Sequence, residues 1–367
     1  MPFIDHANAL LAGAGYGVPD RPPAFPYIAA AIISLGGNAN INLTIYQVIL
    51  SAFTSSLIYA LGRALYSEIT GTLAAWLSVI YFPLIDMARL IGSDTQFIFF
   101  LVLNAWALSR SSAIKMFALG GVLLGIACLT RGAALAAAPL IGLLGLTKMG
   151  TPTPFKRRLI SISTLAIAAA VTLSPWTIRN WIEYRSFVPV SSEGGLNFLQ
   201  GTQISYLESR TGEIELARRL IGDPNANHYT MIRPEHQTAL MNYWWQMWIT
   251  DPLEHLHLRL ISFADFWSPV ERVRYYSIGI STIYSWVTYT VVLFFFIIGA
   301  FLTVKEWRPG TYFLLGSILG VMILHTLTHA EQNRYRLQVE PFIIIIAMYG
   351  AEWIVNHYRA RLAQRIG

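Results

Sequence analysis

Long apolar segments separated by short polar connections dominate the chain. Nine of them are predicted to be membrane-crossing helices, because about 20 helical residues span a hydrocarbon core of about 30 Å. They cover residues 42–62, 70–87, 95–110, 115–130, 132–147, 158–175, 281–303, 311–329 and 338–357. The pattern predicts an all-α polytopic membrane protein with about nine transmembrane helices.

The long polar stretch 182–280 lies between the sixth and seventh expected spans. Residues 234–250 begin with a proline, which suits a first helical turn, and continue with good helix formers. Asp251 is placed to cap a second helix, with Pro252 in its first turn and Glu254 three residues later. We therefore expect surface helices here, either as a structural belt around the bundle or as a cover over a lipid or sugar substrate.

Composition agrees with a membrane protein. With 54% hydrophobic and 13% charged residues over 367 positions, the chain is too apolar for a soluble globule and too long for a single-span anchor. We predict one integral-membrane domain. Its four parts are an outer loop with a short surface helix (1–41), a transmembrane bundle (42–181), a large outer loop (182–280) and a C-terminal transmembrane bundle (281–367).

Basic residues orient this bundle. All four lysines lie on one side, where the connections carry twelve basic residues against five on the short connections opposite, so that side is predicted to be cytoplasmic. The inner set is Arg63, Arg110, Lys115, Lys148, Lys156, Arg157, Arg158, Lys305, Arg308, Arg359, Arg361 and Arg365. The outer set is Arg21, Arg89, Arg131, Arg334 and Arg336. This topology puts Met1 outside without a preceding span, so we expect either an N-terminally shortened chain that lacks a first transmembrane helix or a misassigned start.

Several function classes are disfavoured. The net charge of +6 is spread through short loops between apolar runs, so nucleic acid is not an expected partner. The single cysteine, Cys128, lies in an apolar run, which excludes an internal disulfide framework and a Cys-based zinc site. The lack of a Walker-type phosphate loop argues against an ATP-driven transporter.

Short motifs follow one another along the predicted outer face. They are Arg21-Pro22-Pro23 with Phe25-Pro26-Tyr27, Arg89 with Asp94, Leu129-Thr130-Arg131-Gly132, Pro175-Trp176-Thr177-Ile178-Arg179-Asn180, Val188-Pro189-Val190-Ser191 with Gly194-Gly195, Asp251-Pro252 with Phe266-Trp267-Ser268-Pro269, and Asn333-Arg334-Tyr335-Arg336 with Pro341-Phe342. In this order they resemble the membrane-embedded glycosyltransferases of the C-type superfamily. The nearest resemblance is to protein O-mannosyltransferase-like, aminoarabinose-transferase-like and galacturonosyl-transferase-like enzymes of bacterial envelopes. The resemblance covers nearly the whole chain.

The resemblance implies a glycosyltransferase of the inner (cytoplasmic) membrane with its active site on the outer face. It would move a hexose or pentose from a polyprenyl-phosphate-sugar donor to a lipid, glycan or protein acceptor, among membrane lipids. No cofactor is expected, because arginine can neutralise a single phosphate leaving group; a metal ion stays open as an alternative. The competing hypotheses are a non-catalytic transporter or binding protein for lipid-linked sugars, and an inactive truncated glycosyltransferase.

Five outer arginines are candidates for binding the donor phosphate. Arg21 stands before two prolines that would fix where its side chain points. Arg131 is either a snorkelling turn residue or a second phosphate ligand. Arg334 and Arg336 begin the last span, and we expect only one of them to reach the phosphate. Arg89 is the fifth candidate, on the second outer connection.

Two carboxylates are candidates for the catalytic base. Asp94 opens an apolar helix, so it is predicted to be an N-cap, a catalytic carboxylate, or both. Asp5 is the second candidate. The resemblance places the base of relatives upstream of the position matching Ala7, before Met1, so this chain departs from the family pattern. A shift in register within the loop would put Asp5 in that role.

Two histidines suggest a separate, metal-binding alternative. His325 and His329 lie one helical turn apart, near Glu331, at a spacing that can bind a metal ion. The glutamate that a zinc-hydrolase motif needs between them is absent. Alternatively, His325 and His329 are part of a polar lining at the mouth of the bundle.

Overall fold

The computed structural model describes residues 2–110, 113–148, 154–202, 210–269, 280–308, 310–328 and 333–366. Within these ranges every regular element is a helix, which confirms the predicted all-α class. The bundle consists of α3 (Ala39–Leu65), α4 (Glu68–Ile80), α5 (Phe82–Arg89), α6 (Asp94–Arg110), α7 (Ile114–Thr130), α8 (Ala133–Lys148), α9 (Phe155–Tyr184), α15 (Ile280–Glu306), α16 (Thr311–Thr328) and α17 (Glu340–Ile366).

Each of the nine predicted spans falls on one of these helices or, in one case, on a bent pair. By length and composition, four helices of the described residues could cross a membrane: α3, α9, α15 from Ile283 onward, and α16. Counting α4 and α5 as one broken span raises this number to five. α6, α7 and α8 are apolar but have only 16 or 17 residues each.

The second predicted span is not one continuous helix. Where residues 70–87 were expected to run straight, α4 and α5 meet at an angle of 52°. Tyr81 is extended (φ −75°, ψ 102°) and Pro83 lies in the first turn of α5. Proline has no backbone N–H to donate to the carbonyl oxygen four residues earlier, and its ring clashes with that carbonyl, so the helix ends and restarts here.

The predicted outer segments are also helical. Their elements are α1 (Pro2–Leu11), α2 (Ala24–Ser34), α10 (Gly194–Gln200), α11 (Arg210–Ile221), α12 (His228–Met231), the 3₁₀ helix η1 (Pro234–His236), α13 (Gln237–Thr250), α14 (Pro252–Trp267) and the 3₁₀ helix η2 (Asn333–Gln338). The predicted cap of α14 is present, since the side chain of Asp251 accepts the backbone N–H of Glu254. Sequence patterns did not predict α1, α10, α11 or α12.

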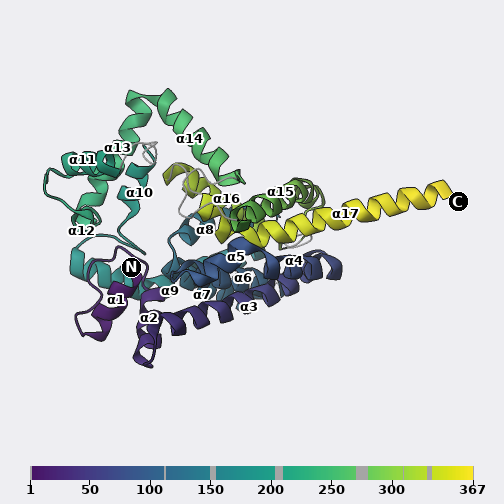
Figure 1. The fold of residues 1–367 in the computed structure, drawn as a ribbon, viewed down its shortest axis with the longest axis horizontal. Helices are drawn as coiled ribbons and strands as arrows, with labels where there is room; N and C mark the ends of the chain where they lie inside the picture. Colours follow the sequence, from purple (N-terminus) through teal and green to yellow (C-terminus); the bar gives the residue numbers. More distant parts are fainter. Residues whose placement is uncertain are drawn as a thin grey trace.

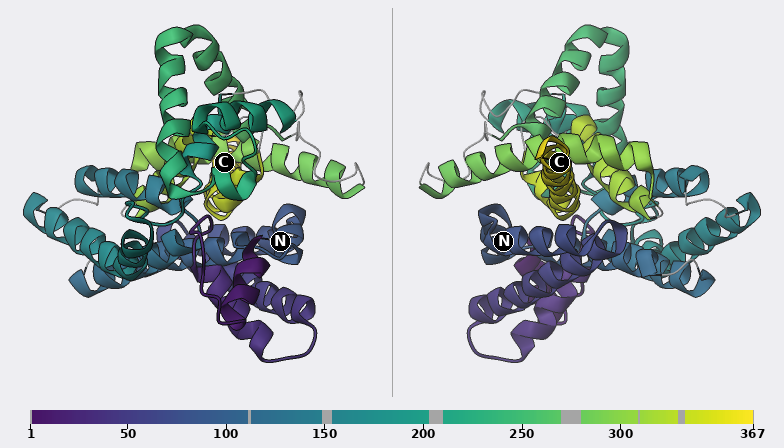
Figure 2. Two further views of the ribbon diagram at one scale, coloured as in Figure 1. Left: turned by 90° about the vertical axis from the view of Figure 1, so that its left-hand side faces the viewer. Right: turned by 90° about the vertical axis from the view of Figure 1, so that its right-hand side faces the viewer.

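The arrangement in space separates two ends. The long helices lie side by side, α1, α2 and α10–α13 gather at one end, and the last turns of α17 project from the other (Figure 1). Views along the long axis show the α13–α14 hairpin on one side of the molecule and α1–α3 on the opposite side (Figure 2).

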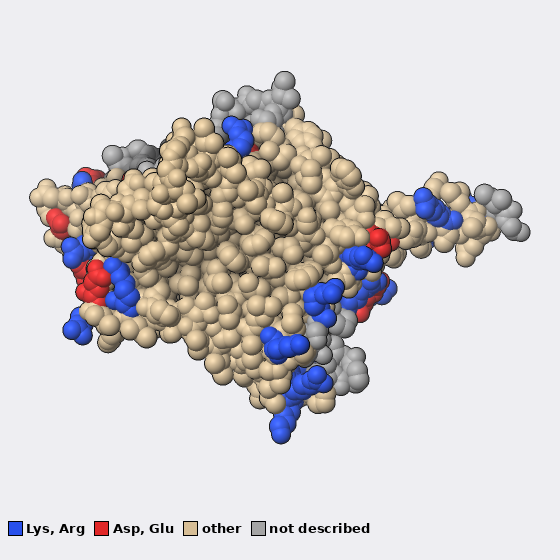
Figure 3. All heavy atoms as spheres, turned by 90° about the horizontal axis from the view of Figure 1, so that it is seen from below, with Lys and Arg blue, Asp and Glu red and all other residues tan. Residues whose placement is uncertain are grey.

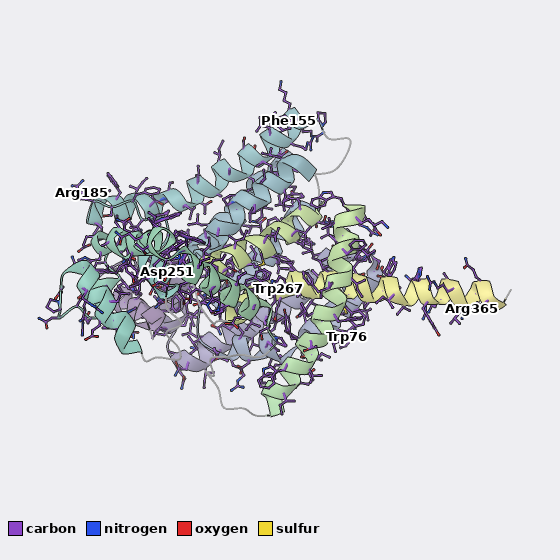
Figure 4. The ribbon with its side chains drawn as sticks, turned by 90° about the horizontal axis from the view of Figure 1, so that it is seen from above. Trp76, Phe155, Arg185, Asp251, Trp267 and Arg365 are labelled. Carbon is purple, nitrogen blue, oxygen red and sulfur yellow. The ribbon has the colours of Figure 1, made fainter. Side chains whose placement is uncertain are left out.

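Charge follows the same division. A broad surface without charged residues lies between two charged ends (Figure 3). Arg185 and Asp251 lie toward one end and Arg365 at the tip of the other (Figure 4). Of the segments predicted to be outer, α1, α2 and α10–α13 are thus at one end, and the C-terminal arginines are at the other, as expected for a multi-pass membrane protein.

Glycines allow the closest helix contacts in the bundle. Gly299 of α15 and Gly350 of α17 face each other, and a Cβ added at Gly299 would overlap the carbonyl oxygen of Ile346. Membrane helices often meet through such small residues, because hydrocarbon offers little other driving force for association.

We predict that Gly299→Ala destabilises the protein by about 1–3 kcal/mol, the usual cost of overpacking. Gly142→Ala is the matched control, because its added Cβ would lie 3.5 Å from Cγ2 of Ile162, an ordinary contact. Unfolding of both variants in one detergent tests this. Equal unfolding midpoints would contradict the tight α15–α17 contact.

Candidate functional site

The connection between α1 and α2 folds back on α1. Three of its glycines have left-handed backbone, Gly13 (φ 73°), Gly15 (φ 76°) and Gly17 (φ 72°), a conformation that favours glycine. Tyr16 between them stacks on His6, with ring centroids 4.3 Å apart, and its hydroxyl donates to the carbonyl oxygen of Arg21 at 2.9 Å. These contacts hold Asp20 and Arg21 beside α1.

His6 links this loop to a buried carboxylate. Its Nδ1 lies 2.9 Å from the carbonyl oxygen of Tyr16, and its Nε2 lies 2.7 Å from Oδ1 of Asp20, whose side chain is 6% exposed. Both partners are acceptors, so the two contacts are satisfied together when the imidazole carries both protons. His6 then acts as the counter-ion of Asp20.

Arg21 forms an ion pair with a residue far along the chain. Its Nη1 lies 2.6 Å from Oε2 of Glu193, in the connection between α9 and α10, and the two side chains are 26% and 12% exposed. Nε of Arg21 lies 3.8 Å from Oδ2 of Asp20, and Nε2 of His228 lies 3.9 Å from the other carboxylate oxygen of Glu193.

Arg131 and Asp94 form a second ion pair. Asp94 is the first residue of α6, Arg131 follows α7 in extended conformation, and Nη1 lies 2.6 Å from Oδ1. Gln338 of η2, oriented with its amide oxygen toward Arg131, accepts from Nε and Nη2 at 3.1 Å each. The ring of Tyr335 lies 5.9 Å from the guanidinium. Two other segments, α6 and η2, therefore fix the position of Arg131.

The two ion pairs adjoin at Glu193. Burial raises the pKa of Glu193 to about 7, Arg21 opposes this rise, Asp20 adds to it, and Arg131 and His6 lower it. Arg131 is thus close enough to act electrostatically on Glu193. We call the set His6, Asp20, Arg21, Asp94, Arg131 and Glu193 the charged cluster.

The other predicted site residues do not lie in the charged cluster. Arg89 is 67% exposed and pairs with Asp86 of its own helix at 3.3 Å. Asp5 is exposed on α1, one residue before His6. The side chain of Arg334 lies outside the described residues.

Arg336 is buried in a separate contact. Its side chain is 5% exposed, and Nε lies 2.9 Å from Oε1 of the fully buried Glu340. It also donates to the carbonyl oxygens of Phe266 (3.0 Å) and Ser268 (2.7 Å). These bonds join the end of α14 to η2 and α17.

Nothing in the described part of the chain forms a group of three or more His, Cys, Asp or Glu side chains able to hold a metal ion. His325 stacks on Tyr335, with ring centroids 3.8 Å apart. Its predicted metal-binding companions, His329 and Glu331, lie outside the described residues. The expectation that no cofactor is needed stays a prediction.

A small cleft lies between α3, α4, α5 and α6 beside the start of α6. Its lining is part hydroxyl and part apolar: Ser51, Thr54, Ser55, Ile58, Ser78, Leu84, Met87, Thr95 and Ile98. Thr95 is the residue after Asp94, so the cleft borders the segment that positions this carboxylate.

Sequence reasoning missed His6, Asp20 and Glu193 as site residues. Asp20 directly precedes the candidate Arg21, and Glu193 directly precedes the Gly194-Gly195 pair of a recognised motif. Charged residues next to such motifs on the predicted outer face were the available signal.

Comparisons with known proteins agree with this architecture. Residues 20–178 match the family model of dolichyl-phosphate-mannose-protein mannosyltransferases, which covers less than half of the chain. No curated protein matches the sequence. A structure of the oligosaccharyltransferase AglB of Archaeoglobus fulgidus with an inhibitory peptide and a dolichol-phosphate superimposes on all of the chain and 47% of AglB, at 12% identity and a TM-score of 0.58.

A second structure of the Archaeoglobus fulgidus oligosaccharyltransferase is tethered to an acceptor peptide containing the NVT sequon. Its superposition includes 92% of the chain and 42% of the oligosaccharyltransferase, at 11% identity and a TM-score of 0.54. A structure of ArnT of Cupriavidus metallidurans bound to undecaprenyl phosphate is less similar. The superposition includes 96% of the chain and 72% of ArnT, at 10% identity and a TM-score of 0.40. The chain spans about half the length of the oligosaccharyltransferase structures.

The fold is therefore that of the membrane-embedded C-type glycosyltransferases, as the sequence motifs suggested. Residues 20–178, which carry Asp20, Arg21, Asp94 and Arg131, are similar to the protein mannosyltransferase family within that class. The predicted family resemblance is confirmed at this level.

The structure separates a structural arginine from a surface one. Arg336→Met leaves Glu340 buried without its cation, so we expect a loss of about 3–5 kcal/mol in stability. Arg89→Ala removes only a mostly exposed pair and should change stability by less than about 1 kcal/mol. Unfolding midpoints of both variants in the same detergent give the comparison.

A double variant, Arg336→Met with Glu340→Met, removes both charges and should regain part of the stability lost in Arg336→Met. If Arg336→Met were as stable as Arg89→Ala, the structural role of Arg336 would be refuted.

Proposed function

We propose that this protein is a glycosyltransferase that moves a sugar from a polyprenyl-phosphate carrier to an envelope acceptor at the outer face of the inner membrane. One observation carries the proposal: Arg21 pairs with Glu193 at 2.6 Å, and Arg131, from a distant part of the chain, acts electrostatically on the same carboxylate at the predicted outer end of a C-type glycosyltransferase fold. A fixed pair of guanidinium groups suits a phosphate, because each planar fork can bind two phosphate oxygens.

Arg21 and Arg131 are assigned to the donor phosphate. Arg131 is 21% and Arg21 is 26% exposed, so both side chains are accessible while their orientation is fixed by carboxylates. They would stabilise the negative charge that develops on the departing phosphate. Arg334, which precedes Tyr335 in η2, is kept as a further candidate because of its position in the chain.

Asp94 is assigned as the catalytic base. It is 33% exposed, against 6% for Asp20 and 12% for Glu193, so it is the carboxylate of the charged cluster that an acceptor hydroxyl reaches most easily. Asp5 is kept as the second candidate because it is exposed on α1, next to His6.

The reaction would be a single displacement. The acceptor oxygen forms a bond to the anomeric carbon while the bond from that carbon to the phosphate oxygen breaks. The hydroxyl proton passes to Asp94, and the electron pair of the broken bond leaves with the polyprenyl phosphate beside Arg21 and Arg131. Attack opposite the leaving group inverts the anomeric configuration.

The test uses purified protein in nanodiscs with polyprenyl-phosphate-linked hexoses and pentoses as donors. Arg131→Ala should weaken donor binding about 10- to 100-fold, since a charge-assisted hydrogen bond contributes about 1.5–3 kcal/mol. Asp94→Asn should bind the donor but lose most of its transfer rate, because the proton acceptor is removed. Arg89→Ala, which leaves the charged cluster intact, serves as the matched control.

Transfer at the wild-type rate by Asp94→Asn would refute the assignment of the base. Movement of intact donor across the membrane with no transfer to any acceptor would instead favour the transporter hypothesis.

A further inference from the structure

Glu193 has no part in the displacement, yet Arg21 pairs with it at 2.6 Å and Arg131 acts on it electrostatically. It comes from the connection before α10, whereas the groups around it come from other segments. They are Arg21 and Asp20 before α2, His6 on α1, His228 on α12 and Arg131 after α7. Its place between these segments calls for a role in the ligand-bound site.

The carboxylates of the cluster already have partners without a ligand. Glu193 pairs with Arg21, Asp94 pairs with Arg131, and Asp20 lies 2.7 Å from His6. A phosphodiester brings one further negative charge. Next to Arg21 it also lies close to Glu193, and a like charge within about 4–6 Å favours the protonated carboxyl. Uptake of one proton offsets this added charge.

Building on the proposed function, we propose that Glu193 takes up one proton from solvent when the donor phosphate binds Arg21. The protonated carboxyl no longer competes for the guanidinium and can donate its O–H to a phosphate oxygen. Donor binding is then coupled to pH through a residue that does not touch the reacting carbon. When the phosphate leaves, Glu193 releases the proton and pairs again with Arg21.

Three features single out Glu193 among the carboxylates of the cluster. Asp20 has the imidazole of His6 at 2.7 Å as its partner. Asp94 is the most exposed carboxylate of the cluster, so water supports its charge. Glu193 is 12% exposed, and burial already raises its pKa to about 7, so a small added repulsion protonates it at neutral pH.

The probe is the monomethyl ester of a polyprenyl phosphate in nanodiscs of neutral lipid. As a phosphodiester it keeps one negative charge throughout, so any pH dependence belongs to the protein. For the wild type we expect constant affinity below about pH 6.5 and a fall approaching tenfold per pH unit above about pH 7, the slope for uptake of one proton. Calorimetry in buffers of different ionisation enthalpy should report the uptake directly.

Glu193→Gln, which resembles the protonated acid, should bind with nearly the low-pH affinity of the wild type and without the slope. Glu183→Gln is the matched control, because Glu183 pairs with Arg179 at 2.5 Å, outside the charged cluster. This variant should keep the wild-type slope.

A wild-type affinity independent of pH, no proton uptake, or a full slope in Glu193→Gln would each overturn the inference while leaving the proposed function standing. No binding of the phosphodiester by the wild type at any pH would overturn the proposed function, and the inference with it. The calorimetric measurement of proton uptake uses only the wild type. It therefore still tests the inference if the Glu193→Gln variant does not fold.

Discussion

Charged side chains close to a hydrocarbon layer need partners, because leaving an ion buried and unpaired costs several kcal/mol. This constraint organises the end of the bundle at which α1, α6, α7 and the connection before α10 meet. The ion pairs Arg131–Asp94 and Arg21–Glu193 are both 2.6 Å long and join segments far apart in the sequence. Glu193 is only 12% exposed, so removing Arg21 would leave a mostly buried carboxylate without its cation. Asp94 is 33% exposed, so water would offset part of the loss of Arg131.

The same constraint gives arginine two different uses. Arg336 is buried, and a fully buried carboxylate and two carbonyl oxygens accept hydrogen bonds from its Nε and Nη1. Arg259 of α14 likewise donates to the carbonyl oxygens of Thr326 and Leu327 in the last described turn of α16. These arginines fasten the surface helices to the bundle. Arg21 and Arg131 keep part of their surface exposed, so their partners can change.

Sequence patterns predicted the helices well because a membrane span depends on local composition. Eight of the nine predicted spans each fall on one helix, and Asp251 caps α14 as its spacing indicated. The bend at Tyr81 was missed although Pro83 was visible, because apolar composition alone does not distinguish a straight span from a broken one.

The site was predicted only in part, for a physical reason. Asp94, Arg21 and Arg131 could be chosen because each stands at a recognisable motif, but their partners are set by tertiary contacts. Arg21 and Glu193 are 172 residues apart, and no period or spacing in the sequence connects them. Arg336 had the same sequence signature as the other outer arginines; only burial and pairing with Glu340 distinguish it.

Without a ligand, carboxylates pair with both arginines of the charged cluster. This arrangement suits an enzyme of the proposed kind, which would bind a lipid phosphate. Two bare guanidinium groups at the edge of a bilayer would repel each other and would attract any anionic headgroup nearby. The carboxylates that pair with Arg21 and Arg131 keep both guanidinium groups oriented. Only a ligand whose own contacts compensate for a lost ion pair can displace these carboxylates. A neighbouring carboxyl that accepts a proton near neutral pH makes this exchange less costly, because it removes one negative charge as the phosphate adds another. Selectivity against ordinary anionic lipids would then come from the carrier's remaining contacts with the bundle, while the charged cluster sets the threshold that any phosphate must pass.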